Sequence, residues 1–132
     1  MTQISEKRNN TPIVLTTGMY DLLKEQLRTR KLSRYNEDKL ILELKSARQV
    51  LSRELPENIV TVDKKVRVKD LNSGEELSFK LVAPAKAKRK HNTDSILSPI
   101  GIAMLGYEQG AELKWEMGGQ IKEYRIEEVS KL

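Results

Sequence analysis

The sequence contains no cysteine and a single histidine, His91. Without cysteine the chain cannot form a disulfide, offer a thiolate nucleophile or bind zinc through thiolates. One histidine cannot supply the several imidazole ligands of a histidine-based metal site. We therefore expect no metal, no cofactor and no catalytic centre built from these residue types, and we expect the chain to work in a reducing cytoplasm.

Long apolar runs are also missing, because no stretch approaches the roughly 20 residues that cross a bilayer. Residues 1–12 are polar, so we expect a flexible tail there rather than a secretory signal. The remaining length suits one compact domain, or a small domain with an appendage. Lysine and arginine number 24 against 19 acidic residues, which gives a net charge of +5. This excess is smaller and more dispersed than nonspecific DNA binding requires.

Residues 13–56 carry apolar side chains at helical spacing and predict two helices. The first is capped by Thr16 or Thr17, the second begins at an Asn36 cap, and Pro56 ends it. The stripes comprise Met19, Leu22, Leu23 and Leu27 in the first helix and Leu40, Leu44, Ala47, Leu51 and Leu55 in the second. Two such helices joined by a short turn predict an antiparallel hairpin, a short coiled coil, whose stripes face each other.

Residues 57–132 change to the alternating pattern of strands. The expected strands are residues 59–71, 77–82, 95–97, 110–117 and 121–129, and the residues Asn72-Ser73-Gly74-Glu75 predict a hairpin turn between the first two. Ser98 as a cap, Pro99 at the first helical position and Gly106 past the end predict one short helix. The predicted class is therefore α+β, with a helical hairpin followed by a small, mostly antiparallel sheet domain that carries one short helix.

This second half resembles a known family. The motif Ser98-Pro99-Ile100-Gly101, with Trp115-Glu116 and Gly118-Gly119, is similar to the C-terminal domain of the bacterial Gre transcript-cleavage factors, and most similar to their Rnk branch, the regulators of nucleoside diphosphate kinase. The resemblance covers residues 59–129. It implies an FKBP-like domain that docks on RNA polymerase at the rim of its secondary channel. It also implies that Ser98, Pro99, Ile100 and Gly101 contact the polymerase.

The expected hairpin tip departs from the cleavage factors, whose longer coiled coil ends in an acidic pair that helps hold magnesium. Here the tip carries Arg30, Lys31 and Arg34, and cations repel a magnesium ion. The nearest carboxylates are Glu37 and Asp38. Adjacent residues on a helix point about 100° apart, which is a poor geometry for chelation, and both suit a helix N-terminus for electrostatic reasons.

These features predict a regulator, not an enzyme, that binds RNA polymerase, competes with cleavage factors and does not cleave transcripts. The alternatives are a cleavage factor with a shortened coiled coil that uses Glu37 and Asp38, and an FKBP-like peptidyl-prolyl isomerase. Fold similarity alone supports the isomerase, and few aromatic residues are present to line its pocket.

A basic loop is the remaining candidate site, formed by Lys86, Lys88, Arg89 and Lys90. It could make a weak contact with nucleic acid or with an acidic polymerase surface. No aromatic side chains interleave with these cations, so a base-stacking platform is not expected. The alternative is a solvated loop without a partner. We expect no membrane contact.

Overall fold

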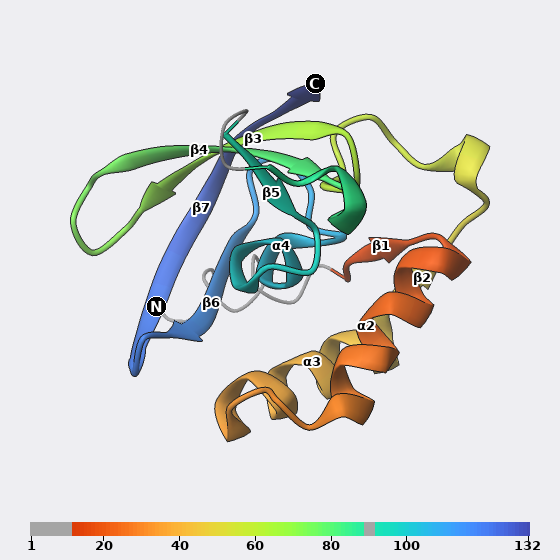
Figure 1. The fold of residues 1–132 in the computed structure, drawn as a ribbon, viewed down its shortest axis with the longest axis horizontal. Helices are drawn as coiled ribbons and strands as arrows, with labels where there is room; N and C mark the ends of the chain where they lie inside the picture. The colour runs from red at the N-terminus through yellow and green to blue at the C-terminus, as the bar shows by residue number, and fades with distance from the viewer. Residues whose placement is uncertain (1–11, 89–91) are drawn as a thin grey trace.

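A computed structural model describes residues 12–88 and 92–132 (Figure 1). The predicted tail, residues 1–12, lies outside the described residues except for Pro12. In chain order the elements are β1 (Val14–Leu15), α2 (Thr17–Thr29), α3 (Arg34–Ser46), β2 (Arg48–Gln49), β3 (Lys64–Asp70), β4 (Glu76–Val82), β5 (Thr93–Ser95), α4 (Pro99–Met104), β6 (Glu112–Met117) and β7 (Gln120–Lys131). Short 3-10 turns occupy Ser52–Glu54 and Pro84–Lys86.

The main sheet has the strand order β5-β4-β3-β7-β6, and its pairs are antiparallel except for β4 with β5. Alternation along β3 explains its two faces, because Val66 and Val68 are fully buried while Lys65 is exposed on the other side. The short helix α4 lies against the buried face of the sheet (Figure 1). The predicted α+β class is confirmed.

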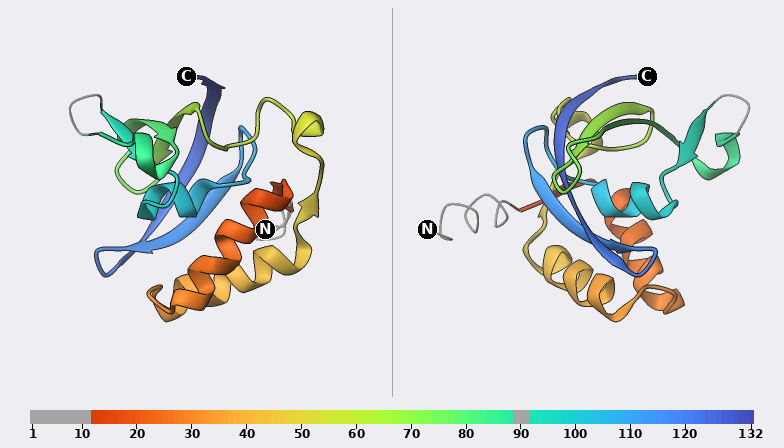
Figure 2. Two further views of the ribbon diagram at one scale, coloured as in Figure 1. Left: turned by 45° about the vertical axis from the view of Figure 1, so that its right-hand side comes forward. Right: turned by 90° about the vertical axis from the view of Figure 1, so that its left-hand side faces the viewer.

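Helices α2 and α3, called the helix pair below, are joined by a tight turn (Figure 2). Thr16 caps α2 as predicted, since its Oγ1 accepts a hydrogen bond from the N–H of Met19 at 3.2 Å. Ser33 caps α3 in the same way, through the N–H of Asn36 at 3.2 Å. The prediction of Asn36 as the cap is therefore wrong. Arg30 ends α2 in a left-handed conformation with φ of 56°.

The predicted extension of the second helix to Leu55 is also wrong. The helix ends at Ser46, and the next residues form β2, which pairs in parallel with β1. The N–H of Arg48 donates to the carbonyl of Ile13 at 2.9 Å. Strand pairing at the base of the helix pair thus outweighs the helical spacing of the later leucines, and Leu51 is left 53% exposed.

Several strand boundaries also differ from expectation, most of all those of the first and third predicted strands. The first predicted strand begins only at Lys64, because Val60 instead pairs with the segment after α4, where its N–H donates to the carbonyl of Tyr107 at 2.9 Å. The predicted strand at residues 95–97 lies slightly earlier, at Thr93–Ser95, where it pairs with β4.

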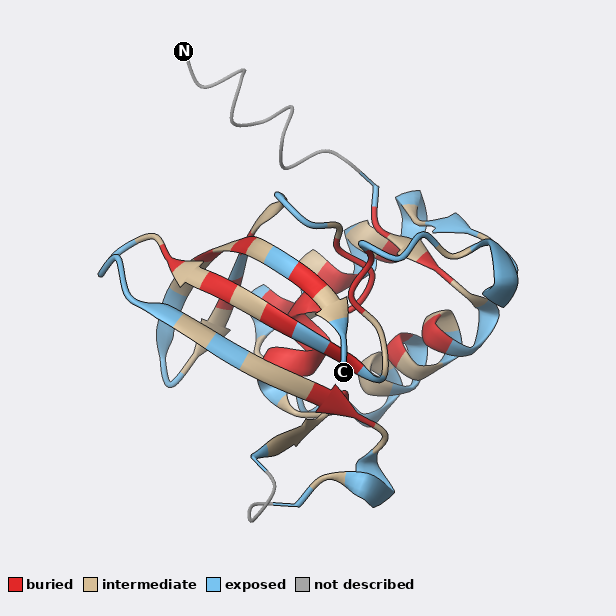
Figure 3. Cartoon of the chain, turned by 90° about the horizontal axis from the view of Figure 1, so that it is seen from above, coloured by how far each residue is buried: buried red, intermediate tan, exposed pale blue. Residues whose placement is uncertain are grey.

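One hydrophobic core extends from the helix pair to the sheet (Figure 3). Leu23 and Leu40 from the helices and Val66 and Trp115 from the sheet are each no more than 2% exposed. Gly106, with a φ of 90°, lets the segment after α4 approach β1 closely, because a Cβ there would lie 2.6 Å from Leu15 Cδ2. The predicted division of the chain into parts 13–56 and 57–132 stays a prediction.

The turn between β3 and β4 depends on Asp70. Its Oδ1 accepts hydrogen bonds from the N–H groups of Asn72 at 2.8 Å and Ser73 at 3.2 Å. These backbone donors stabilise the charged carboxylate and lower the pKa of Asp70. Gly74 completes the turn with a φ of 80°, as its position in the predicted turn requires.

This geometry predicts a pH-dependent contribution of Asp70 to stability. Since the pKa of Asp70 is lower in the folded than in the unfolded chain, its contribution is present above the unfolded value of about 4 and is lost as the pH falls through the folded value. We expect Asp70→Asn to lower the free energy of unfolding near neutral pH and to reduce its loss on acidification. Urea titrations at a series of pH values measure this, with the surface variant Asp21→Asn as control. Parallel curves for wild type and Asp70→Asn would contradict the assignment.

Candidate protein-interaction site

A groove of about 440 Å³ lies where the turn of the helix pair, the start of α4 and the β6–β7 turn meet. We call it the junction groove. Its lining residues are Lys31, Leu32, Ser33, Asn36, Leu97, Pro99, Ile102, Trp115, Glu116, Met117, Gly118 and Gly119. Segments far apart in the sequence therefore build one surface.

The junction groove is apolar at its base and charged at its rim. Trp115 and Ile102 are buried and form the base, whereas Pro99 is exposed. Lys31 is exposed and places a cation at the rim. Glu116 also lines the groove, so the surface suits an apolar side chain of another protein flanked by polar groups.

Asn36 holds the helix pair against the sheet at this groove. Its Nδ2 donates to the carbonyl of Glu116 at 2.9 Å, and its Oδ1 accepts from the N–H of Glu116 at 2.8 Å. The Asn36 residue is only 4% exposed. An amide that satisfies both main-chain groups of one strand residue acts as a short piece of neighbouring strand, so it fixes the helix pair in a defined register along β6.

The four residues that the family resemblance implies as polymerase contacts differ in their exposure and in their structural roles. Ser98 caps α4, because its Oγ accepts from the N–H of Gly101 at 3.2 Å. Ile100 is 8% exposed and belongs to the core. A Cβ on Gly101 would lie 2.6 Å from the carbonyl oxygen of Ile96, so this position requires glycine for packing. Pro99 is the exposed member of the motif, and it lines the junction groove.

The predicted tip residues lie around the turn of the helix pair. Arg30 and Lys31 are exposed, and Lys31 alone of the five lines the junction groove. Arg34 makes an exposed ion pair with Asp38, with Nε and Oδ2 3.4 Å apart. Glu37 is half-buried, on a different side of the helix from Asp38. The two carboxylates therefore do not converge on a common point.

Of the basic loop, the described residues Lys86 and Lys88 do not line the junction groove. Lys86 and Lys88 are exposed, and the N–H of Lys88 donates to Thr93 Oγ1 at 2.8 Å. Arg89 and Lys90 lie outside the described residues. Within the described ranges, no three His, Cys, Asp or Glu side chains gather in a way that could hold a metal ion. The described helices also include none long and apolar enough to cross a bilayer.

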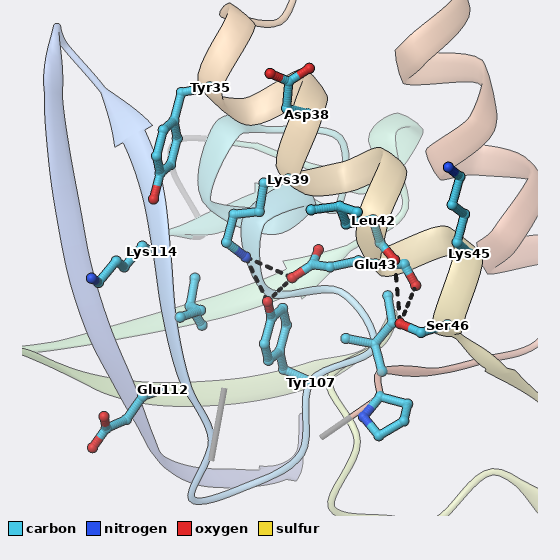
Figure 4. Close-up of a pocket in the computed structure, with 13 residues that line it drawn as sticks. Tyr35, Asp38, Lys39, Leu42, Glu43, Lys45, Ser46, Tyr107, Glu112 and Lys114 are labelled. Carbon is cyan, nitrogen blue, oxygen red and sulfur yellow. Dashed lines mark hydrogen bonds and ion pairs between the residues drawn. The ribbon is translucent and has the colours of Figure 1, made fainter. Parts of the chain in front are cut away.

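A second groove, of about 840 Å³, lies between α3 and β6 (Figure 4). At its centre Lys39 Nζ lies 2.6 Å from Glu43 Oε2 and 2.7 Å from the Tyr107 hydroxyl, which itself donates to Glu43. Burial raises the pKa of the Glu43 carboxyl, and the neighbouring Lys39 ammonium opposes that shift. This closed set of polar contacts connects α3 to the segment after α4, so it supports the same arrangement that Asn36 holds.

Sequence reasoning missed the three residues of this network and the role of Asn36. A signal was present for Asn36, because it precedes Leu40 and Leu44 at steps of four on the buried face of α3. A polar residue within an apolar stripe indicates a buried polar contact. The spacing of Lys39 and Glu43 predicts an ion pair, but nothing local predicts that Tyr107 joins it.

Comparison with known proteins gives consistent matches. Residues 55–131 match the family model described as transcription elongation factor, GreA/GreB, C-terminal. The regulator of nucleoside diphosphate kinase of Escherichia coli K12 is 33% identical over 84 residues, which are 64% of this chain and 62% of that protein. The transcription elongation factor GreA of Clostridium acetobutylicum is 35% identical over 83 residues, which are 63% of this chain and 52% of GreA. The matches thus span about half to three fifths of these relatives.

A solved structure extends the similarity to most of the chain. The GreA/GreB transcription elongation factor from Nitrosomonas europaea is 34% identical, with a TM-score of 0.61. The alignment covers 92% of this chain and 99% of that one. The helix pair and the sheet therefore both have counterparts in the aligned protein.

The Asn36 contact gives a stability prediction. Asn36→Ala removes the partner of two main-chain groups of Glu116, so we expect the free energy of unfolding to fall by about 2 kcal/mol. Glu37→Ala, one position along the same helix, should change it by less than about 0.5 kcal/mol. Urea unfolding followed by circular dichroism measures both. Equal stability of Asn36→Ala and wild type would show that Asn36 does not hold the helix pair in place.

Proposed function

Because the chain belongs to the GreA/GreB family of transcription elongation factors, we propose that it is a transcription regulator that binds RNA polymerase. It would dock at the rim of the secondary channel and act by occupying that position. Longer channel-binding factors would then be excluded by competition. This mode of action needs no catalytic group, and we propose that the protein is not an enzyme.

The junction groove is the observation that carries this proposal. Pro99, the exposed residue of the motif through which the family resemblance implies polymerase contact, lines the same groove as Lys31 from the turn of the helix pair. One partner element could therefore touch both parts of the molecule at once. An apolar base around Trp115 provides the buried centre that a protein interface needs.

The absence of transcript cleavage is the second part of the proposal. Helix α2 has 13 residues, so the helix pair is about 20 Å long, which is short for reaching the buried active centre of RNA polymerase. Arg30 and Lys31 bring positive charge to its turn, where a magnesium ion requires carboxylates. Asp38 is engaged with Arg34, and Glu37 points elsewhere.

Three further details belong to the same proposal. The sheet domain would be of FKBP-like type, without isomerase activity, because the junction groove has a single aromatic side chain, Trp115, among its lining residues. The site of action would be the cytoplasm. The exposed Lys86 and Lys88 would add a weak electrostatic contact with nucleic acid or an acidic polymerase surface.

Binding to polymerase should depend on Pro99. Pro99→Glu places a carboxylate at a helix N-terminus, where it is tolerated, but it also puts charge on the apolar groove. We expect binding to RNA polymerase to weaken about tenfold or more, which corresponds to about 1.4 kcal/mol, with unchanged unfolding. Ser52→Glu is the control, because Ser52 is likewise the exposed first residue of a short helical turn but does not line the groove. Equal binding by both variants would place the contact elsewhere, and failure of the wild type to bind polymerase at low salt would refute the function.

Transcript cleavage should not be stimulated. A backtracked elongation complex incubated with saturating protein should release short 3′ RNA fragments only at its intrinsic rate, because the tip lacks a magnesium-binding pair. The same protein should suppress the cleavage driven by an added Gre factor. Faster release that is abolished by Glu37→Ala or Asp38→Ala would instead establish a shortened cleavage factor.

A further inference from the structure

Helix α3 carries apolar side chains on a buried face and on an exposed, outer face. Leu40 and Leu44 on the inner face are 1% and 7% exposed, within the core. Ile41 and Leu42 on the outer face are 38% and 66% exposed, and Leu42, with Asp38 and Lys45, also lies along the edge of the second groove. A helix at the surface of a soluble protein usually presents polar residues to water, and adjacent exposed apolar residues indicate a surface that another molecule covers.

Charges of opposite sign flank this outer apolar pair. Asp38 lies one turn before it and Lys45 one turn after it, and both are exposed. At 100° per residue, these two side chains fall within the same arc of about 100° as Ile41 and Leu42. Figure 4 shows Asp38 and Lys45 near opposite ends of α3, with Leu42 between them. We call Asp38, Ile41, Leu42 and Lys45 the outer stripe.

The outer stripe is self-complementary under a two-fold rotation. The midpoint between Asp38 and Lys45 falls between Ile41 and Leu42. If two copies of α3 pack antiparallel about that midpoint, Asp38 of each copy lies opposite Lys45 of the other, and the apolar pairs meet at the centre. In a two-fold dimer a residue i that faces residue j of the other copy is matched by j facing i, so both pairs of opposite charge form together.

We propose that the outer stripe of α3 is a homodimer interface, in which two copies of this chain associate through antiparallel α3 helices. A second copy explains both the apolar centre and the symmetric placement of the two charges. The inference goes beyond polymerase binding and does not rest on it. The junction groove uses the turn of the helix pair and leaves the outer stripe uncovered.

The neighbouring charges are compatible with this arrangement. Arg34 contacts Asp38 on the surface at 3.4 Å, with 87% and 61% of their side chains exposed. Such an exposed pair contributes little energy and does not prevent Asp38 from pairing across an interface. The other charged pair on α3, Lys39 with Glu43, faces Tyr107 and the sheet rather than the outer stripe.

The interface is small. A helix of 13 residues is about 20 Å long, so the contact lies at the low end of the size range for protein interfaces. The dimer should therefore be weak and should depend on protein concentration by mass action. Paired charges at both ends make it sensitive to reversal of either sign.

Charge reversal in the full-length chain tests the proposal. The variants are Asp38→Lys, Lys45→Asp and the double variant that carries both changes, studied by sedimentation velocity over a roughly hundredfold range of concentration. Each single variant places like charges at both ends of the interface, so we expect its self-association to weaken about tenfold or more. The double variant should recover, because opposite charges again face each other. A mixture of the two single variants should form heterodimers. Circular dichroism controls for helix content.

The outcomes separate the alternatives. Dimerisation of the wild type, its loss in each single variant and its return in the double variant or the mixture establish the interface. A wild type that stays monomeric over the whole range overturns the proposal. Self-association that is unchanged by both charge reversals, or that is restored neither in the double variant nor in the mixture, overturns it as well, because the contact then lies elsewhere. Leu42→Gln should abolish dimerisation without affecting the junction groove.

Discussion

The bidentate contact between the Asn36 side chain and the main chain of Glu116 determines how the two parts of this molecule sit together. Apolar packing alone would let a helix slide along a sheet with small changes in energy, because hydrophobic contacts are not directional. Hydrogen bonds to one particular strand residue remove that freedom. The junction groove exists only in this register, since its walls come from the helix turn on one side and the β6–β7 turn on the other.

The network of Lys39, Glu43 and Tyr107 supports the same register from the middle and C-terminal half of α3. Charged groups in a partly buried place carry a desolvation cost, and the raised pKa of Glu43 reflects it. What such contacts provide is geometric specificity, because each polar group must meet its partner to be stable. Two separate polar contacts along one helix define its orientation as well as its position.

Apart from the cap of α3, where the nearby Ser33 and not Asn36 supplies the hydroxyl, local sequence patterns predicted most of the elements and failed where tertiary pairing decides. The caps at Thr16 and Ser98 and the turn around Gly74 depend on a few adjacent residues, so their spacing was sufficient. The end of α3 at Ser46 depends on β1, which is distant in sequence, and the helical spacing of Leu51 and Leu55 gave the wrong answer there. Prediction of the site residues succeeded for local features and failed for tertiary ones in the same way. The motif at Ser98 and Pro99 was visible in the sequence, but which of its residues is exposed depends on how α4 packs on the core. The contacts of Asn36 and Tyr107 join residues far apart in the chain, and no local pattern contains them.

The parallel pairing of β1 with β2 ties together the two ends of the helix pair, just before α2 and just after α3. With that base closed and Asn36 held at Glu116, the helix pair is fixed to the rest of the molecule at two points. Each inserted residue would advance a helix by about 1.5 Å and rotate it by about 100°, so a single insertion before Asn36 would turn its amide away from the strand. Only insertions of whole helical turns, matched in both helices, would keep the inner face on the core, and these would still carry Asn36 past its strand partner. The length and the orientation of the helix pair are therefore not independent in this fold. A longer helix pair would have to be held in place by different contacts.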